Sequence, residues 1–262
     1  MGLTKILSII IVIQVAIAHK IAKKGEFSFM ISVQKSHRHV CSGVLIRENY
    51  ALTAASCVSD NITQYSIKVG ALMTYDDSYG VQIISIARII IHPGYGPSNT
   101  SMHDIAILQW KPKSNRYTII NLPQPNESVN VMKKSRIINY RMCELKEFEV
   151  DRLKYFIAFA IRNKKCAAKL RKRNNLYAQK RINETATALH KSLFCATGKK
   201  KVLYYTIEGD FGYPLIQQYK KKPVLVGLAS AVSPHNRRVK HFIFTQISLH
   251  VNWINKAINS DH

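Results

Sequence analysis

Acidic residues are scarce in this chain. Its 262 residues include 15 Asp+Glu against 39 Lys+Arg, a formal net charge of +24 at pH 7. The excess is concentrated in residues 133–201, which hold 20 of the 39 basic residues and five acids. Such an imbalance predicts attraction to polyanions. The alternative is a solvated basic surface with no dedicated ligand.

Long apolar runs are also absent, except at the N-terminus. There, Ile6–Val15 follows the basic Lys5 and precedes Ala16-Ile17-Ala18, an A-x-A cleavage site. The run falls short of the ~20 apolar residues that a membrane span needs. It predicts a signal peptide over 1–18, a mature chain that begins at His19, and a secreted protein.

Helical patterns are sparse, and the chain contains no internal repeat or low-complexity linker. Short apolar or alternating runs between turn residues dominate, which is typical of an all-β barrel or sandwich. Two helices are predicted, over 164–173 and 248–259, the second with one apolar face. The predicted strands cover 27–33, 39–46, 50–55, 65–69, 81–91 and 104–110.

Cysteines are few and odd in number. Secretion permits disulfides, and five cysteines leave one over after pairing. Four Asn-x-Ser/Thr motifs are typical of a secreted glycoprotein. The cysteines are Cys41, Cys57, Cys143, Cys166 and Cys195, and the glycosylation candidates are Asn61, Asn99, Asn126 and Asn183.

Segments along nearly all of the mature chain resemble, in order, those of the trypsin-like serine proteases. Ile21–Gly25 stands where that family has Ile-Val-Gly-Gly, and Ile89–Tyr95 resembles Ile-Ile-x-His-Pro-x-Tyr. The others are Val40–Ile46, Leu52–Cys57, His103–Leu108, Leu193–Gly198, Glu208–Leu215 (Gly-Asp-Ser-Gly-Gly-Pro-Leu in the family), Phe244–Ile247 and Val251–Ile254.

This resemblance implies a fold. The homology domain over 19–262 would form two six-stranded antiparallel β-barrels with a C-terminal α-helix. The first barrel would cover about 21–122, and the second barrel with the helix about 123–262.

The resemblance places Ser56, Asp104 and Phe211 at the three catalytic positions of the family, and only Asp104 matches. Acyl transfer by this mechanism needs a hydroxyl nucleophile and an imidazole base. We therefore expect no catalytic residue and no enzyme activity. A relocated site built on His103 or Ser230 is disfavoured, because neither residue supplies both nucleophile and base.

The resemblance also locates the specificity pocket. Tyr205, Val232 and Phe242 stand at its positions and are predicted to fill it, with ordinary repacking as the alternative for each. Gly209 and Asp210 remain from the oxyanion loop.

In the family, cleavage before the residue matching Ile21 frees an ammonium that pairs with the aspartate matching Asp210. Lys20–Ile21 is a candidate cleavage site. However, Lys23 and Lys24 replace the glycines that let the strand thread inward, which favours no such switch. Asp210 would then pair with a lysine or remain as a leftover loop residue.

The disulfide pattern follows from the same resemblance. It pairs Cys41 with Cys57 and Cys166 with Cys195. Cys143 is left over, as a buried free thiol or in an intermolecular bridge. Two further bridges of the family are missing as whole pairs, one ending at Ile207 and the other at about Ser135 and Gln217.

Two functions follow. The first is a secreted, non-catalytic homologue that binds an extracellular protein, as a cofactor, decoy or adaptor in a proteolytic, immune, venom or reproductive setting. The alternative is a cationic polyanion-binding or antimicrobial effector, because Thr53–Cys57 also resembles the azurocidin group of cationic granule proteins in this family. A residual serine endopeptidase is the least favoured hypothesis.

The expected partners are an extracellular protein or an anionic glycan, with an anionic membrane surface as a further candidate. Secretion and the lack of a nucleic-acid module disfavour nucleic acid. No metal or cofactor is expected. The polyanion-binding candidates are Lys164, Lys165, Lys169, Arg171, Lys172, Arg173, Lys199, Lys200 and Lys201.

Overall fold

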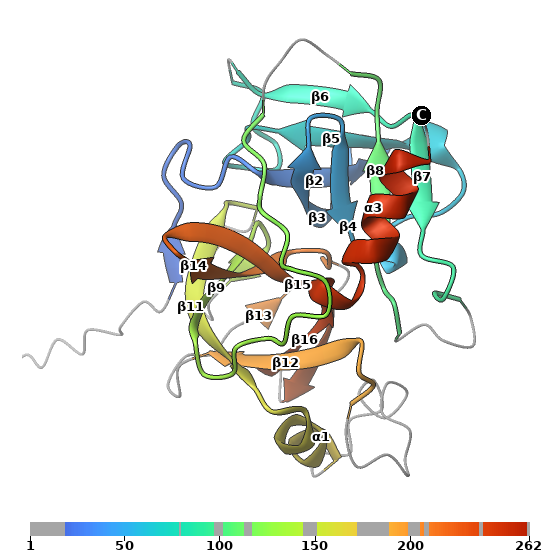
Figure 1. The fold of residues 1–262 in the computed structure, drawn as a ribbon. Helices are drawn as coiled ribbons and strands as arrows, with labels where there is room; N and C mark the ends of the chain where they lie inside the picture. Colours follow the sequence, from blue (N-terminus) through green and yellow to red (C-terminus); the bar gives the residue numbers. More distant parts are fainter. Residues whose placement is uncertain are drawn as a thin grey trace, which may run out of the picture.

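The computed structural model has two halves built from β-strands, stacked one above the other in Figure 1. It describes residues 19–78, 80–96, 102–112, 117–143, 151–171, 189–198, 205–206, 210–235 and 238–260. The predicted signal peptide over 1–18 lies outside these residues. Within the described part of the chain, no helix is both long and apolar enough to cross a membrane.

Six strands of the second half close into an antiparallel barrel. Their order is β11-β12-β16-β15-β14-β9, and β9 pairs back with β11. β1 (His19–Ile21) extends this sheet alongside β11, and β10 (Met142–Cys143) pairs with β13 (Tyr205–Thr206) as a separate ribbon. The barrel strands are β9 (Lys134–Asn139), β11 (Lys154–Ile161), β12 (Leu193–Gly198), β14 (Pro214–Tyr219), β15 (Lys222–His235) and β16 (Arg238–Gln246).

The first half is a curled sheet in the order β6-β5-β2-β3-β4-β8-β7. Its two edge strands are halves of the single strand predicted over 81–91, which the structure bends at Ile86 and Ala87. There the Ile86 N–H bonds Tyr65 O and the Ala87 N–H bonds Gln109 O, so this one segment joins both edges. The strands are β2 (Met30–Lys35), β3 (Arg38–Arg47), β4 (Tyr50–Thr53), β5 (Tyr65–Val69), β6 (Gln82–Ser85), β7 (Arg88–Ile91) and β8 (Ala106–Gln109).

The C-terminal helix returns from the second half to the first. The predicted helix over 248–259 appears as the 3-10 turn η3 (Ile247–Leu249) followed by α3 (Val251–Asn259). Val251, Ile254 and Ile258 are spaced to share one helix face, and all three are buried in the core of the first half. Figure 1 shows α3 beside β7 and β8. The predicted all-β fold with a C-terminal helix is therefore confirmed, with one closed six-stranded barrel and one curled, seven-stranded half-barrel in place of two six-stranded barrels.

Both predicted disulfides form. Cys41–Cys57 links β3 to the 3-10 turn η1 (Ala55–Cys57), and Cys166–Cys195 links α1 (Asn163–Arg171) to β12. The side chain of Cys143 lies outside what the structure describes. A further 3-10 turn, η2, covers Ile62–Gln64.

Ser135 and Gln217 replace one of the missing bridges with a hydrogen bond. They face each other in register on β9 and β14. Both side chains are buried, and Gln217 Nε2 donates to Ser135 Oγ at 3.0 Å. A hydrogen-bonded pair of side chains thus occupies the position where the family resemblance indicates a disulfide.

Candidate functional site

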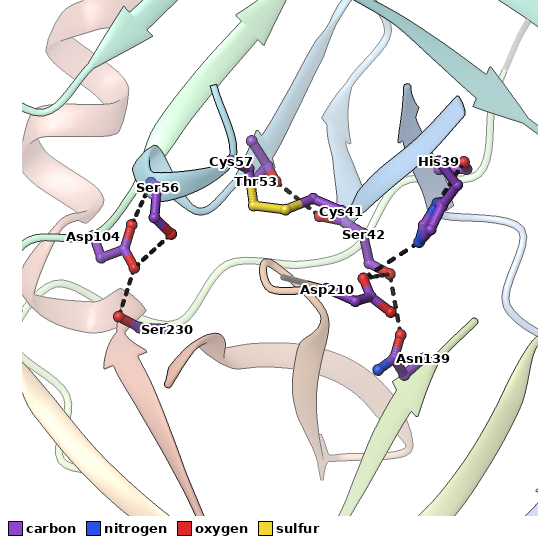
Figure 2. Close-up of a disulfide and its surroundings, with 11 residues drawn as sticks. His39, Cys41, Ser42, Thr53, Ser56, Cys57, Asp104, Asn139, Asp210 and Ser230 are labelled. Carbon is purple, nitrogen blue, oxygen red and sulfur yellow. Dashed lines mark hydrogen bonds and ion pairs between the residues drawn. A yellow bond between two sulfur atoms is a disulfide. The ribbon is translucent and has the colours of Figure 1, made fainter. Parts of the chain in front are cut away.

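Asp104 lies just before β8, and its side chain is completely buried. The Ser56 N–H donates to Asp104 Oδ1 at 2.8 Å, and the Ser56 hydroxyl donates to Oδ2 at 3.0 Å. Ser230, from β15 in the other half, donates to the same Oδ2 at 2.6 Å (Figure 2). A buried carboxylate is tolerated only when its oxygens are hydrogen-bonded. These three donors meet that requirement.

The local chain holds Ser56 in this position. Ser56 is the middle residue of η1, where the Cys57 N–H bonds Ala54 O at 3.1 Å and the Cys41–Cys57 disulfide ties the turn to β3. The imidazole nearest to Asp104 in sequence belongs to His103. Its Nδ1 lies 3.0 Å from His250 Nε2, so that this ring nitrogen is hydrogen-bonded to another histidine.

Phe211 lies in the loop before β14, and its half-buried side chain packs against the core of the first half. Its carbonyl accepts the Ser42 N–H at 2.9 Å. The next residue, Gly212, has φ of 74°, and a Cβ there would collide with the Ser42 carbonyl oxygen. The loop is therefore clamped between the two halves, with a phenyl ring at the position that the family resemblance aligns with the nucleophile.

Phe242 is the one pocket position whose side chain the structure describes. It is fully buried, and its ring lies 5.4 Å from that of Phe156 in the core of the second barrel. Val232 faces it across β15 and β16. The side chains of Tyr205 and Val232, and Gly209 altogether, lie outside what the structure describes. A filled pocket therefore stays a prediction.

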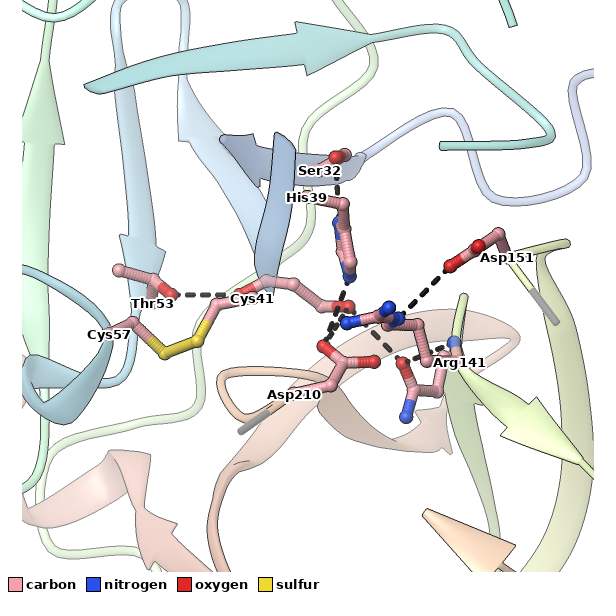
Figure 3. Close-up of polar contacts among 10 residues, drawn as sticks. Ser32, His39, Cys41, Thr53, Cys57, Arg141, Asp151 and Asp210 are labelled. Atoms are coloured by element: carbon pink, nitrogen blue, oxygen red, sulfur yellow. Dashed lines mark hydrogen bonds and ion pairs between the residues drawn. A yellow bond between two sulfur atoms is a disulfide. The ribbon is translucent and has the colours of Figure 1, made fainter. Parts of the chain in front are cut away.

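Asp210 is completely buried beside a histidine (Figure 3). His39 Nε2 lies 3.3 Å from Asp210 Oδ1, and Ser32 Oγ lies 2.8 Å from His39 Nδ1. Ser42 Oγ also lies 3.3 Å from Asp210 Oδ1. Because an ionised carboxylate only accepts hydrogen bonds, Nε2 carries the imidazole proton.

This arrangement corrects the expectation that Asp210 pairs with a lysine or is a leftover loop residue. Among the described residues, the side chains that contact Asp210 Oδ1 are those of His39 and Ser42. Burial first, and the charge of Asp210 second, raise the pKa of the nearby Tyr140 and Tyr213 phenols. Sequence reasoning missed His39 and Ser32, since neither matches a motif and their approach depends on the β2–β3 hairpin.

The candidate cleavage site Lys20–Ile21 lies within β1 of the uncleaved chain. Ile21 is the last residue of β1, pairs with Lys154 on β11, and is 46% exposed. His19 and Lys20 pair in the same way with Phe156 and Tyr155. The absence of a cleavage switch stays a prediction.

Basic side chains lie on α1, at the end of the second barrel that is away from the first half (Figure 1). Lys164 and Lys165 on α1 are exposed and Lys169 is half-buried. A pocket of about 320 Å³ beside them is lined by Val131, Met132, Ile161, Arg162 and Lys165. The candidates outside the described residues are Lys172, Arg173, Lys199, Lys200 and Lys201, and the side chain of Arg171 is likewise not described.

Two of the four glycosylation candidates can be placed. Asn61 and Asn126 are exposed, as an acceptor asparagine must be. Asn99 and Asn183 lie outside the described residues.

Comparisons with known proteins agree with this fold. The family model described as Trypsin matches residues 16–254. Granzyme B(G,H) of Mus musculus is 27% identical over 225 residues, which cover 84% of this chain and 81% of that protein. The solved structure of human heparin binding protein superposes with a TM-score of 0.72 at 21% identity, over 92% of this chain and 96% of that one. From the family match and the fold together, the chain belongs to the trypsin family.

Proposed function

We propose that this chain is a secreted, non-catalytic member of the trypsin family that acts by binding. The hydrogen bonding of Asp104 carries the proposal. In a working triad the aspartate orients an imidazole that takes a proton from serine. Here Asp104 accepts instead from Ser56 and Ser230, two hydroxyls with no basic nitrogen. Both hydroxyls donate to a carboxylate rather than to an imidazole, which is the general base that activates serine in this mechanism.

The nucleophile position supports the same conclusion. A phenyl ring has no atom able to attack a carbonyl, and the Phe211 side chain packs against the core. His103 is the nearest alternative base in sequence, but its Nδ1 is hydrogen-bonded to His250. Rigid barrels with variable loops are common scaffolds for binding sites. We therefore expect the partner, an extracellular protein or an anionic glycan, to bind the surface.

Restoring the two lost side chains is expected not to restore peptidase activity. The variant Ser56→His with Phe211→Ser rebuilds the triad residues but leaves Tyr205, Val232 and Phe242 at the pocket positions. We expect no turnover of small ester or amide substrates above the uncatalysed rate, and no labelling by a fluorophosphonate probe. Both measurements are sensitive, because an intact triad contributes about 10⁶-fold in kcat.

Wild-type protein and the single variants serve as matched controls, with an active trypsin as the positive control. Turnover by the double variant alone would refute the filled pocket and leave the loss of the triad as the only block. Turnover by the wild-type protein would overturn the non-catalytic proposal itself.

A specific observation favours an anionic glycan as the partner. Arg162, Lys164 and Lys165 are close in sequence and exposed, and Arg162 and Lys165 line the pocket described above. The buried Cys166–Cys195 bridge anchors the helix that carries them to β12. A helix anchored in this way needs little backbone ordering on binding, which lowers the entropic cost of association. The protein of similar fold is named a heparin binding protein, which supports this alternative by analogy.

The expected result is late elution of the mature protein from a heparin column in a salt gradient. The variant Arg162→Gln, Lys164→Gln, Lys165→Gln should elute at clearly lower salt, because each released counterion contributes to the salt dependence. The matched control is Lys220→Gln, Lys221→Gln, Lys222→Gln, which removes the same charge from an exposed turn between β14 and β15.

Equal shifts in the two variants would make the attraction diffuse and would contradict a glycan site at α1. The search would then turn to protein partners in the native fluid. Because net charge is matched between the variants, only location distinguishes them.

A further inference from the structure

We propose that His92, His103 and His250 form a binding site for a transition-metal ion, with Zn²⁺ as the ion that fits best. The three residues are far apart in sequence, and the fold gathers them. His92 directly follows β7, His103 precedes Asp104, and His250 directly precedes α3. One ring nitrogen from each lies within 4.8 Å of the others. This site is independent of whether the chain is catalytic.

The backbone prepares His250 as a ligand. Its Nδ1 lies 2.7 Å from the carbonyl oxygen of Gln246 and can only donate to it. The lone pair of the neutral ring is therefore on Nε2, which is directed at His103. A second ring nitrogen bonded to a backbone carbonyl is the usual outer-shell contact of a metal-binding histidine, and it fixes the tautomer.

His103 faces that lone pair. Its Nδ1 lies 3.0 Å from His250 Nε2, so one proton is shared between two nitrogens. Zn–N distances of about 2.0–2.1 Å in a tetrahedral site require N···N separations of about 3.3–3.4 Å. A metal ion can thus replace the shared proton after a shift of a few tenths of an ångström. Neutral His103 has a single ring proton, so this proton moves from Nδ1 to Nε2 when the ion binds, and no net proton is released.

His92 provides the third nitrogen after a ring rotation. Its ring is stacked on His103, with centroids 4.6 Å apart and planes 5° from parallel. Two parallel rings cannot both aim a lone pair at one ion, so binding must turn His92. It is half-buried, and a single hydrogen bond from the Gly94 N–H to its Nδ1, at 3.0 Å, holds it. Water would complete the tetrahedron.

The surroundings agree with this assignment. Burial first, and the neighbouring histidines second, lower the pKa of His92 to about 4. Burial likewise lowers the pKa of His250 to about 4, although the Gln246 carbonyl opposes the shift, and it also lowers the pKa of His103. Imidazole binds metals in its neutral form. Three imidazoles favour zinc, copper or nickel over calcium or magnesium, which prefer oxygen ligands.

The alternative is an aromatic packing cluster that binds no ion. His92 also lies 4.8 Å from the Trp253 ring, and His190 lies 5.8 Å from His103. Stacked rings with no affinity for metal would show the same distances. A zinc titration distinguishes the two interpretations, because a packing cluster would not bind the ion.

The test is calorimetric titration of the mature, metal-stripped protein, free of any polyhistidine tag, with ZnCl₂. We expect one ion per chain, and with CoCl₂ the visible absorption bands of a tetrahedral site. The variant His92→Asn with His103→Asn should weaken zinc affinity by at least about tenfold, since even outer-shell changes cost that much. Asparagine suits His103, whose φ is 55°.

His37→Asn is the matched control, because His37 is exposed, has φ of 65° and lies outside the cluster. It should bind zinc like the wild-type protein. No saturable binding by the wild-type protein, or equal binding by the cluster variant, would overturn the site. The double variant can also lose affinity because it is less stable, which a lower melting temperature in EDTA would reveal. In that case the single variant His92→Asn tests the site. Unchanged zinc affinity in this variant would remove His92 from the site.

Discussion

Replacing Gly212 with alanine is expected to lower the free energy of unfolding by roughly 3–5 kcal/mol, the range of severe point substitutions. Two costs add at this position. The backbone φ of 74° disfavours any side chain, and a Cβ would collide with the Ser42 carbonyl oxygen and lie 2.5 Å from Thr53 Oγ1. Both contacts belong to the neighbouring half, so the loop cannot retreat without separating the two. Urea denaturation with a check of the slope measures the loss.

Gly25→Ala is the matched control, because Gly25 has a similar φ of 80° but only Ser28 Oγ within reach of a Cβ, at 3.9 Å. It should cost only the conformational part, about 1–2 kcal/mol. A loss at Gly212 no larger than the loss at Gly25 would show that the loop carrying Phe211 is not clamped between the halves.

Introducing the missing bridge should have the largest stabilising effect. The double variant Ser135→Cys with Gln217→Cys places two thiols opposite each other on paired strands, where the Cα separation of antiparallel partners, about 4.5–5.5 Å, suits a disulfide. Closing a loop of this length is expected to add about 2–4 kcal/mol to the free energy of unfolding. The gain is net of the hydrogen bond between Ser135 and Gln217 that is lost.

The variant is best made with Cys143→Ser, which removes the unpaired cysteine as a competing partner. Ser135→Ala with Gln217→Ala in the same background is the control, since it removes the hydrogen bond without adding a bridge. Peptide mapping confirms the new disulfide, and the urea midpoint reports stability. A bridged protein no more stable than the alanine control would show that the strands must distort to close it.

Much of the fold is readable from the sequence, for local reasons. Val251, Ile254 and Ile258 repeat with helical spacing, so the residue pattern alone indicates the apolar face of α3. The resemblance to a known family also predicted both disulfides. The bend at Ile86 and Ala87 was not readable, because the apolar pattern continues through it and only pairing with two different strands breaks it.

The site divides in the same way. The proposed loss of the histidine and serine rests on residue identity at two positions, Ser56 and Phe211, which the sequence supplies by itself. Which groups then occupy the vacated contacts is decided by residues distant in sequence: Ser230 reaches Asp104 across 126 positions, and His39 reaches Asp210 across 171. Sequence reasoning offered a lysine partner or none for Asp210, because it cannot weigh partners that only the packing of the two halves brings together.

The sequence by itself therefore determined the family, the all-β class, the disulfides and the positive charge, since each rests on residue type or local spacing. Only the tertiary structure decided how Asp104 and Asp210 are paired, and that His92, His103 and His250 meet. Hydrogen bonds and metal–ligand bonds act over about 3 Å or less. A chain of this length has too many polar pairs for local patterns to select those that approach so closely.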